Sequence, residues 1–277
     1  MTAGLLAIAT LGLGAALLVP IAFSDPNGVD PYLARLSATS VVLVVAAFAL
    51  RRLAPARPVL LALVAVAASY TLLSASPAII RHLFGTRAPG FTTQVFLASL
   101  LEVLATMLIV VLAVRALPGG VRPDTRLQRV GIRPLAIAVA ACVLLLLAGL
   151  ALPAQLLGRF GLQPVQIARD LPWLAPACAL QAFSQEVQFR GLLMGALERT
   201  MSAGWANVAQ AAVFGLSHLA IAYGGPLAPF VPVTFVVGFV FGWVVQRTNS
   251  LWTAVIIHAV ADIALTATVL SGLYGLN

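Results

Sequence analysis

Charged side chains are scarce in this chain of 277 residues: they make up 9% of it, and lysine is absent altogether. Histidine occurs three times and cysteine twice. Soluble domains carry about 25% charged residues, so this scarcity excludes an ordinary soluble domain. Cys142 and Cys178 each lie within an apolar stretch, which argues against a disulfide framework or a thiolate metal site.

Hydrophobic residues instead fill 61% of the chain, in long continuous runs. A membrane-spanning helix needs about 20 mostly apolar residues. We therefore predict an all-α fold, a polytopic transmembrane helix bundle of eight or nine spans, in an integral protein of the bacterial cytoplasmic membrane. The candidate spans cover residues 2–23, 33–50, 58–78, 93–114, 134–152, 172–198, 202–222, 227–246 and 251–273.

All sixteen basic residues are arginine, and the formal net charge is +8. This charge could attract nucleic acid, but nearly all the arginines lie between spans, where they act as topology signals, and we expect no nucleic-acid partner. With a cytoplasmic N-terminus, ten arginines fall in cytoplasmic loops and five outside, which favours this orientation and, with nine spans, an external C-terminus. The ten are Arg51, Arg52, Arg57, Arg115, Arg122, Arg126, Arg129, Arg133, Arg199 and Arg247; the five are Arg35, Arg81, Arg87, Arg159 and Arg169.

The longest polar segment, residues 115–133, is rich in proline, glycine and arginine. This composition is typical of a linker. We predict an N-terminal transmembrane part of four spans over residues 1–114, a cytoplasmic linker over 115–133, and a C-terminal transmembrane part over 134–277.

Three polar clusters interrupt the apolar runs in the last third of the chain. They are Gln185 to Gly191, Phe214 to His218, and His258 to Asp262. An ionisable side chain in the middle of a bilayer costs about 2.5 to 3.5 kcal/mol or more. Five such groups on three membrane segments therefore indicate a functional site.

Helical periodicity predicts that each cluster forms a polar face. Glu186 and Arg190 share one face at a four-residue spacing, which suits an ion pair. His218 ends a mostly polar stripe, and His258 shares a face with Asp262. Because none of these faces can contact lipid cheaply, we expect them to converge on a polar pocket.

Such a pocket supports two kinds of chemistry. Carboxylate, guanidinium and imidazole groups can activate water and stabilise an oxyanion, as amide hydrolysis requires. The same carboxylate and imidazoles are normal ligands of a divalent metal such as zinc, for which Glu186, His218 and His258 are the candidates. Spacing alone favours neither chemistry.

The three clusters, in this order and with one extra span between the second and third, resemble the motifs of the CAAX-protease and bacteriocin-processing (CPBP, or Abi) family of intramembrane proteases. This family includes the type II CAAX prenyl endopeptidases. Its motifs are Glu-Glu-x-x-x-Arg, Phe-x-x-x-His, and His-x-x-x-Asn or Asp. The resemblance covers about residues 172–268 and implies an all-helical bundle that hydrolyses a membrane-associated or lipidated peptide.

The resemblance also implies roles for single residues. The family's water-activating position falls on Gln185, whose amide cannot accept a proton at neutral pH. Glu186 matches the second family glutamate, and Arg190 matches the motif arginine. The groups that stabilise the tetrahedral intermediate are matched by His218, His258 and Asp262. We therefore expect Glu186 to act as base, directly or through a water positioned by Gln185.

Non-catalytic alternatives remain open, both for the chain as a whole and for its single residues. The fold can persist without catalysis, as an immunity factor, a scaffold or a carrier. Glu186 can serve only as the ion-pair partner of Arg190, and the two motif histidines can be hydrogen-bonded core residues. Asp262 can act through His258 by fixing its tautomer.

One further carboxyl, Glu102, lies within the fourth candidate span, outside the three motifs. We expect it to be protonated and hydrogen-bonded within the bundle. The alternatives are an intramembrane arginine partner or a place near the polar pocket.

Overall fold

The computed structural model describes residues 9, 11, 12, 14, 29–49, 56–85, 91–116, 126–127, 131–151, 164–218 and 230–274. Every regular element within these residues is a helix, which confirms the all-α prediction. The first candidate span, residues 2–23, lies outside the described residues except at four positions, so it stays a prediction.

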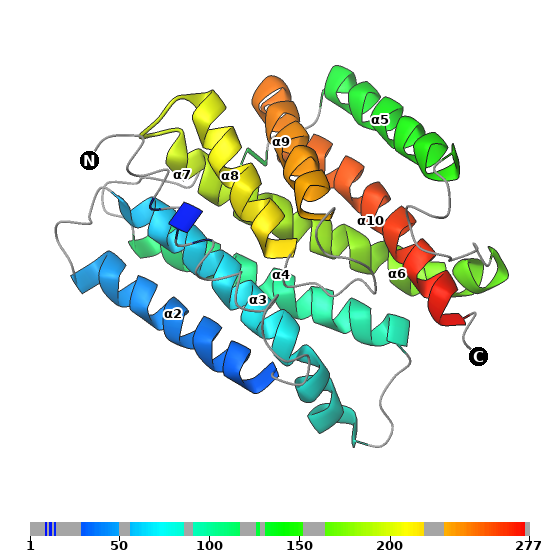
Figure 1. Cartoon of the computed structure of the whole chain (residues 1–277), viewed down its shortest axis with the longest axis horizontal. Coiled ribbons are helices and arrows are strands. Elements are labelled where there is room, and N and C mark those ends of the chain that lie inside the picture. The colour runs from blue at the N-terminus through cyan, green and yellow to red at the C-terminus, as the bar shows by residue number, and fades with distance from the viewer. Residues whose placement is uncertain are drawn as a thin grey trace.

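Three helices from the N-terminal half form one side of the bundle (Figure 1). They are α2 (Val29–Ala49), α3 (Arg57–Phe84) and α4 (Phe91–Ala116). α3 packs against both neighbours, and residues 59–67 along it are all buried. Many of these residues are alanine or valine, whose small side chains allow helices to approach closely.

The second half supplies the remaining helices. They are α5 (Ile132–Ala151), α6 (Pro164–Glu186), η5 (Val187–Met194), α7 (Gly195–Leu197), α8 (Ala203–Ser217), α9 (Phe230–Thr248) and α10 (Leu251–Tyr274). α6 packs against α4 and α10, α8 packs against α9, and α5 lies on α10 (Figure 1). α6 therefore joins the two halves of the chain.

The segment η5 is a π-helix, and all eight of its residues are buried. It packs against α3, α6 and α8. We had expected one α-helix over residues 172–198; instead the helix starts at Pro164, keeps Pro172 and Pro176 inside it, and changes to π geometry after Glu186. π-helical turns are rare and often lie at functional sites.

Two stretches of the described residues, Thr92–Leu112 and Val231–Thr248, are long and apolar enough to cross a membrane. A third results if Arg57–Leu73 and Ala78–Phe84, which meet at 46°, count as one span. α2, α5 and α10 contain shorter apolar stretches. The total of eight or nine spans stays a prediction.

Three polar loops meet at one end of the bundle. Arg126, from the segment expected to be the linker, forms an ion pair with Glu198 after α7, and its main-chain carbonyl accepts a hydrogen bond from Leu251 N at 3.0 Å. Gln246, near the end of α9, donates to Glu198 Oε1 at 2.8 Å and to the carbonyl of Ala203 at 2.8 Å. The loops that the arginine bias assigns to one membrane side therefore lie together.

Candidate active site

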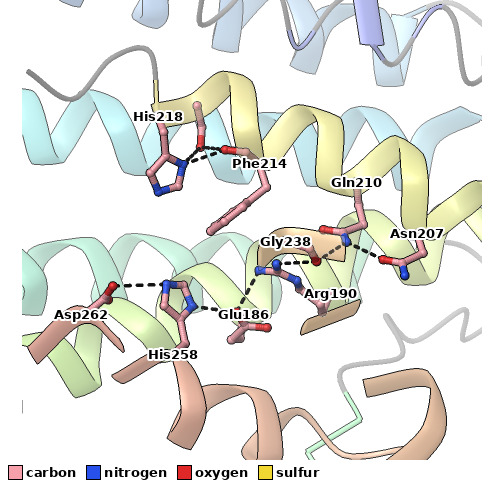
Figure 2. Close-up of polar contacts among 10 residues, drawn as sticks. Glu186, Arg190, Asn207, Gln210, Phe214, His218, Gly238, His258 and Asp262 are labelled. Atoms are coloured by element: carbon pink, nitrogen blue, oxygen red, sulfur yellow. Dashed lines mark hydrogen bonds and ion pairs between the residues drawn. The ribbon is translucent and has the colours of Figure 1, made fainter. Parts of the chain in front are cut away.

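The carboxylate of Glu186 lies at the centre of the described polar residues (Figure 2). Arg190, one turn further along the first-motif helix, donates from Nη1 to Glu186 Oε1 at 2.8 Å. Both side chains are completely buried. The ion pair expected from the four-residue spacing is therefore present, and each charge is neutralised where an isolated one would be strongly unfavourable.

The Arg190 guanidinium is enclosed on several sides. Its Nη2 donates to the main-chain carbonyl of Gly238 at 2.9 Å. Its central carbon lies 4.5 Å from the ring centroid of Phe214 and 5.4 Å from that of Phe241. A guanidinium stacks favourably on aromatic faces, so α8 and α9 together fix the cation that holds Glu186.

α9 approaches this cluster closely because it has glycine at two positions one turn apart. A Cβ on Gly238 would lie 2.8 Å from a ring carbon of Phe214, and one on Gly242 would lie 1.9 Å from Asn207 Oδ1. Gln210 lies beside Asn207 there, and its Nε2 donates to the Gly238 carbonyl at 3.0 Å and to Asn207 Oδ1 at 2.7 Å. The polar stripe of α8 thus reaches Arg190 through the backbone of α9.

His258 lies between two carboxylates (Figure 2). Its Nδ1 is 2.7 Å from Glu186 Oε1, and its Nε2 is 3.5 Å from Asp262 Oδ1 on the next turn of α10. A neutral imidazole has one N–H, whereas an imidazolium has two. A protonated His258 therefore satisfies both contacts at once, with Asp262 orienting the ring.

His218 enters the site from the end of α8. Its Nδ1 donates to the carbonyl of Phe214 at 2.8 Å, which assigns the proton to that nitrogen. The Phe214 ring centroid lies 4.6 Å from that of His218 and 5.8 Å from that of His258. Phe214 therefore stands between the two imidazoles, with both of them in contact with one ring.

Gln185 is buried, with 4% of its surface exposed. Neither its Oε1 nor Oε2 of Glu186 has a hydrogen-bond partner among the described residues. Buried polar atoms are rarely left unpaired in proteins. These two oxygens are therefore acceptors available to a water or a substrate N–H.

Among the described residues, no group of three or more histidine, cysteine, aspartate or glutamate side chains is arranged to hold a metal ion. Of the candidates for zinc, Glu186 contacts His258 directly, whereas Phe214 intervenes between His258 and His218. The groups around Glu186 form hydrogen bonds and ion pairs with one another.

A buried network of carboxylates, arginine and histidines on apolar helices is the kind of site that a membrane-embedded hydrolase uses. Residues 167–264 match the family model described as type II CAAX prenyl endopeptidase Rce1-like. The matched segment is close to the predicted 172–268 and covers about a third of the chain, and it supports an assignment to the CPBP family of CAAX proteases. Members of that family are integral membrane peptidases. Neither the curated proteins nor the solved structures include a match to the chain.

The structure places four of the six predicted site residues in one network: Glu186, Arg190, His258 and Asp262. His218 joins it through Phe214. Sequence reasoning missed Gly238, whose contribution is a main-chain carbonyl, and Phe241, whose ring faces Arg190. The glycine pair in α9 was a signal that could have revealed the first of these.

Proposed function

We propose that the chain is an intramembrane endopeptidase of the CAAX-protease type, which hydrolyses a membrane-associated or lipidated peptide in the bacterial cytoplasmic membrane. One observation carries the proposal: Glu186 is held by Arg190 and His258 through Oε1 alone. Its Oε2 is buried and has no partner among the described residues. A carboxylate fixed through one oxygen has the other available as a general base.

The reaction that these groups support is direct hydrolysis. Glu186 Oε2 removes a proton from a water whose oxygen bonds to the carbonyl carbon of the peptide. The carbonyl electrons move onto its oxygen. An imidazolium at His218 can donate from Nε2 to this oxyanion while its Nδ1 keeps the Phe214 carbonyl. A protonated His258, whose two N–H groups face Glu186 and Asp262, contributes its positive charge. As the C–N bond breaks, the proton held by Glu186 passes to the leaving nitrogen, and the carboxylate is restored.

Each remaining residue has a supporting role in this proposal. Arg190 holds Glu186 in place through the buried ion pair at 2.8 Å. Asp262 orients His258. Gln185, which occupies the position of the usual family glutamate, offers its amide oxygen to the attacking water.

The alternative is a non-catalytic membrane protein on the same fold, an immunity factor, a scaffold or a carrier. The complete burial of Glu186 and Arg190 favours it, because an enclosed ion pair can serve to join helices. In that role Glu186 needs no access to a peptide.

Cleavage of a prenylated reporter peptide by the purified chain in phospholipid vesicles separates the two functions. Glu186→Gln keeps the size of the side chain but removes the base, so we expect cleavage to fall by about 100-fold or more. His218→Ala should abolish cleavage as well, and both variants should stay folded. A matched control is Ser40→Ala, since among the described residues Ser40 Oγ bonds to the carbonyl of Leu36 within α2. Equal cleavage by Glu186→Gln would refute the catalytic role.

A further inference from the structure

Two amide side chains on α8, Asn207 and Gln210, are buried in the bundle, yet the proposed reaction uses neither of them. Their exposed fractions are 1% and 0%. They lie three residues apart on one face of the helix, in the polar stripe that ends at His218. A buried amide is costly unless it is hydrogen-bonded, so the partners of these two side chains indicate their role.

Both amides donate to main-chain carbonyls of α9. Asn207 Nδ2 donates to the carbonyl of Phe239 at 3.0 Å. Gln210 Nε2 donates to the carbonyl of Gly238 at 3.0 Å and to Asn207 Oδ1 at 2.7 Å (Figure 2). Because both partners of Gln210 Nε2 are acceptor oxygens, the amide has one favourable orientation, with its N–H groups toward them. Asn207 thus fixes the orientation of the Gln210 amide.

The carbonyl of Gly238 is shared by two donors. Besides the bond from Gln210, it accepts one from Arg190 Nη2 at 2.9 Å. Arg190 Nη1 donates in turn to Glu186 Oε1 at 2.8 Å. Consecutive hydrogen bonds therefore lead from Gln210 through Gly238 and Arg190 to the carboxylate of Glu186.

Arg190 depends on α8 and α9 at the same time. The ring of Phe214, on which its guanidinium stacks, belongs to α8, whereas Phe241 and the carbonyl of Gly238 belong to α9. If the two helices shifted relative to each other, the guanidinium would lose contacts with one of them. Asn207 and Gln210 join the helices beside these contacts, so they restrain that shift.

This restraint should affect the reaction rate more than the stability of the bundle. Hydrogen bonds between helices in a membrane contribute little net free energy of folding, because separated helices find other partners. A misplacement of about 1 Å at a catalytic group, by contrast, can cost about 100-fold in rate. The rate is therefore the more sensitive measure of what the amides do.

We propose that Gln210 is a positioning residue of the active site and that Asn207 orients it. Gln210 holds the Gly238 carbonyl where Arg190 binds, and Arg190 keeps Glu186 Oε2 directed at the attacking water. The inference rests on the proposed hydrolysis. Neither amide touches the peptide or exchanges a proton with it.

Gln210→Met tests the inference with the reporter peptide in vesicles. Methionine has nearly the length of glutamine but no N–H donor. We expect kcat to fall by about tenfold or more and KM to change by less than about twofold, because the base is misaligned while the peptide binds as before. Gln246→Met is the matched control. Gln246 Nε2 also joins α9 to α8, but through the carbonyl of Ala203 at the start of α8.

The two methionine variants should unfold at similar temperatures, and only Gln210→Met should lose kcat. Natural kcat in Gln210→Met, or an equal loss of kcat in Gln246→Met, would overturn the inference and leave the proposed hydrolysis intact. Inactivity of the natural chain would overturn the hydrolysis and this inference with it.

Asn207→Leu decides the question if Gln210→Met does not fold. Leucine fills nearly the same space as asparagine but neither accepts from Gln210 nor donates to Phe239. The bond from Gln210 to Gly238 stays possible, so we expect a smaller loss of kcat, about threefold or more, again with little change in KM. Natural kcat in this variant would overturn the inference.

Discussion

Arg190 donates to the main-chain carbonyl of Gly238 across 2.9 Å, although α9 carries none of the three sequence motifs. The span that separates the second and third motifs is thus part of the site. Its contribution is a backbone acceptor together with the absence of a side chain. Substitutions in α9 should therefore affect a site whose named residues lie on other helices.

Gly242→Ala tests the close packing of α9 against α8. Its Cβ would lie 1.9 Å from Asn207 Oδ1. Either the Asn207 side chain gives up its hydrogen bonds to Gln210 and to the Phe239 carbonyl, or α8 and α9 separate, at a cost of about 1–3 kcal/mol. We expect a lower thermal unfolding temperature in detergent. Gly204→Ala is the control, because within the described part of the chain a Cβ built there meets no atom within 4 Å beyond its chain neighbours and its own helix backbone. Equal stability of the two variants would contradict the close packing of α9.

Arg190→Met should be strongly destabilising, because it removes the arginine partner of a completely buried carboxylate and leaves only His258 against it among the described residues. Breaking such a pair from one side costs about 3–5 kcal/mol. The double variant Glu186→Gln/Arg190→Met removes both charges, so it should recover much of the stability while remaining inactive. Thermal unfolding together with peptide cleavage measures both effects. Recovery of cleavage in the double variant would be incompatible with Glu186 as base.

Asp262→Asn should slow turnover less than loss of the base does. Asp262 touches His258 Nε2 at 3.5 Å, and groups that orient a functional histidine typically contribute about 10- to 100-fold. We expect a decrease of that size in kcat with little change in KM. A loss as large as that of Glu186→Gln would assign Asp262 a direct role instead.

The orientation of the chain is testable by cysteine labelling. After Cys142 and Cys178 are replaced by serine, Asp124→Cys should react with an impermeant maleimide only in opened cells, because the arginine bias predicts that this loop is cytoplasmic. His82→Cys, at an exposed end of α3, should react in intact cells. Labelling in the reverse pattern would invert the predicted topology.

The sequence predicted those parts of the site that follow from spacing and from the cost of polar groups in lipid. Glu186 and Arg190 are four residues apart on a helix, and their ion pair needs no further information. The contact between Glu186 and His258 follows from the need to bury two polar faces together. Eight of the nine predicted segments correspond to described helices, although the number of spans does not follow from this.

Other features of the site could not be predicted, because the types of side chain in the sequence do not indicate them. The acceptor of Arg190 is a main-chain carbonyl, which every residue has, and only the adjacent glycines hint at it. The π-helix from Val187 to Met194 has no distinctive composition and depends on packing from several sides. The partners of Glu102 are serine and glutamine side chains on three helices, a set that sequence order does not bring together.

The contacts of Arg126, Glu198 and Gln246 restrain one end of the bundle, where α8 begins. α8 then runs for fifteen residues before it reaches His218, a distance of about 22 Å at the rise of an α-helix. When two helices are held together at one end, a change in the angle between them moves their opposite ends furthest apart. A small tilt of α8 about the Glu198 end would therefore displace His218, the residue that follows the helix, further than any residue within it.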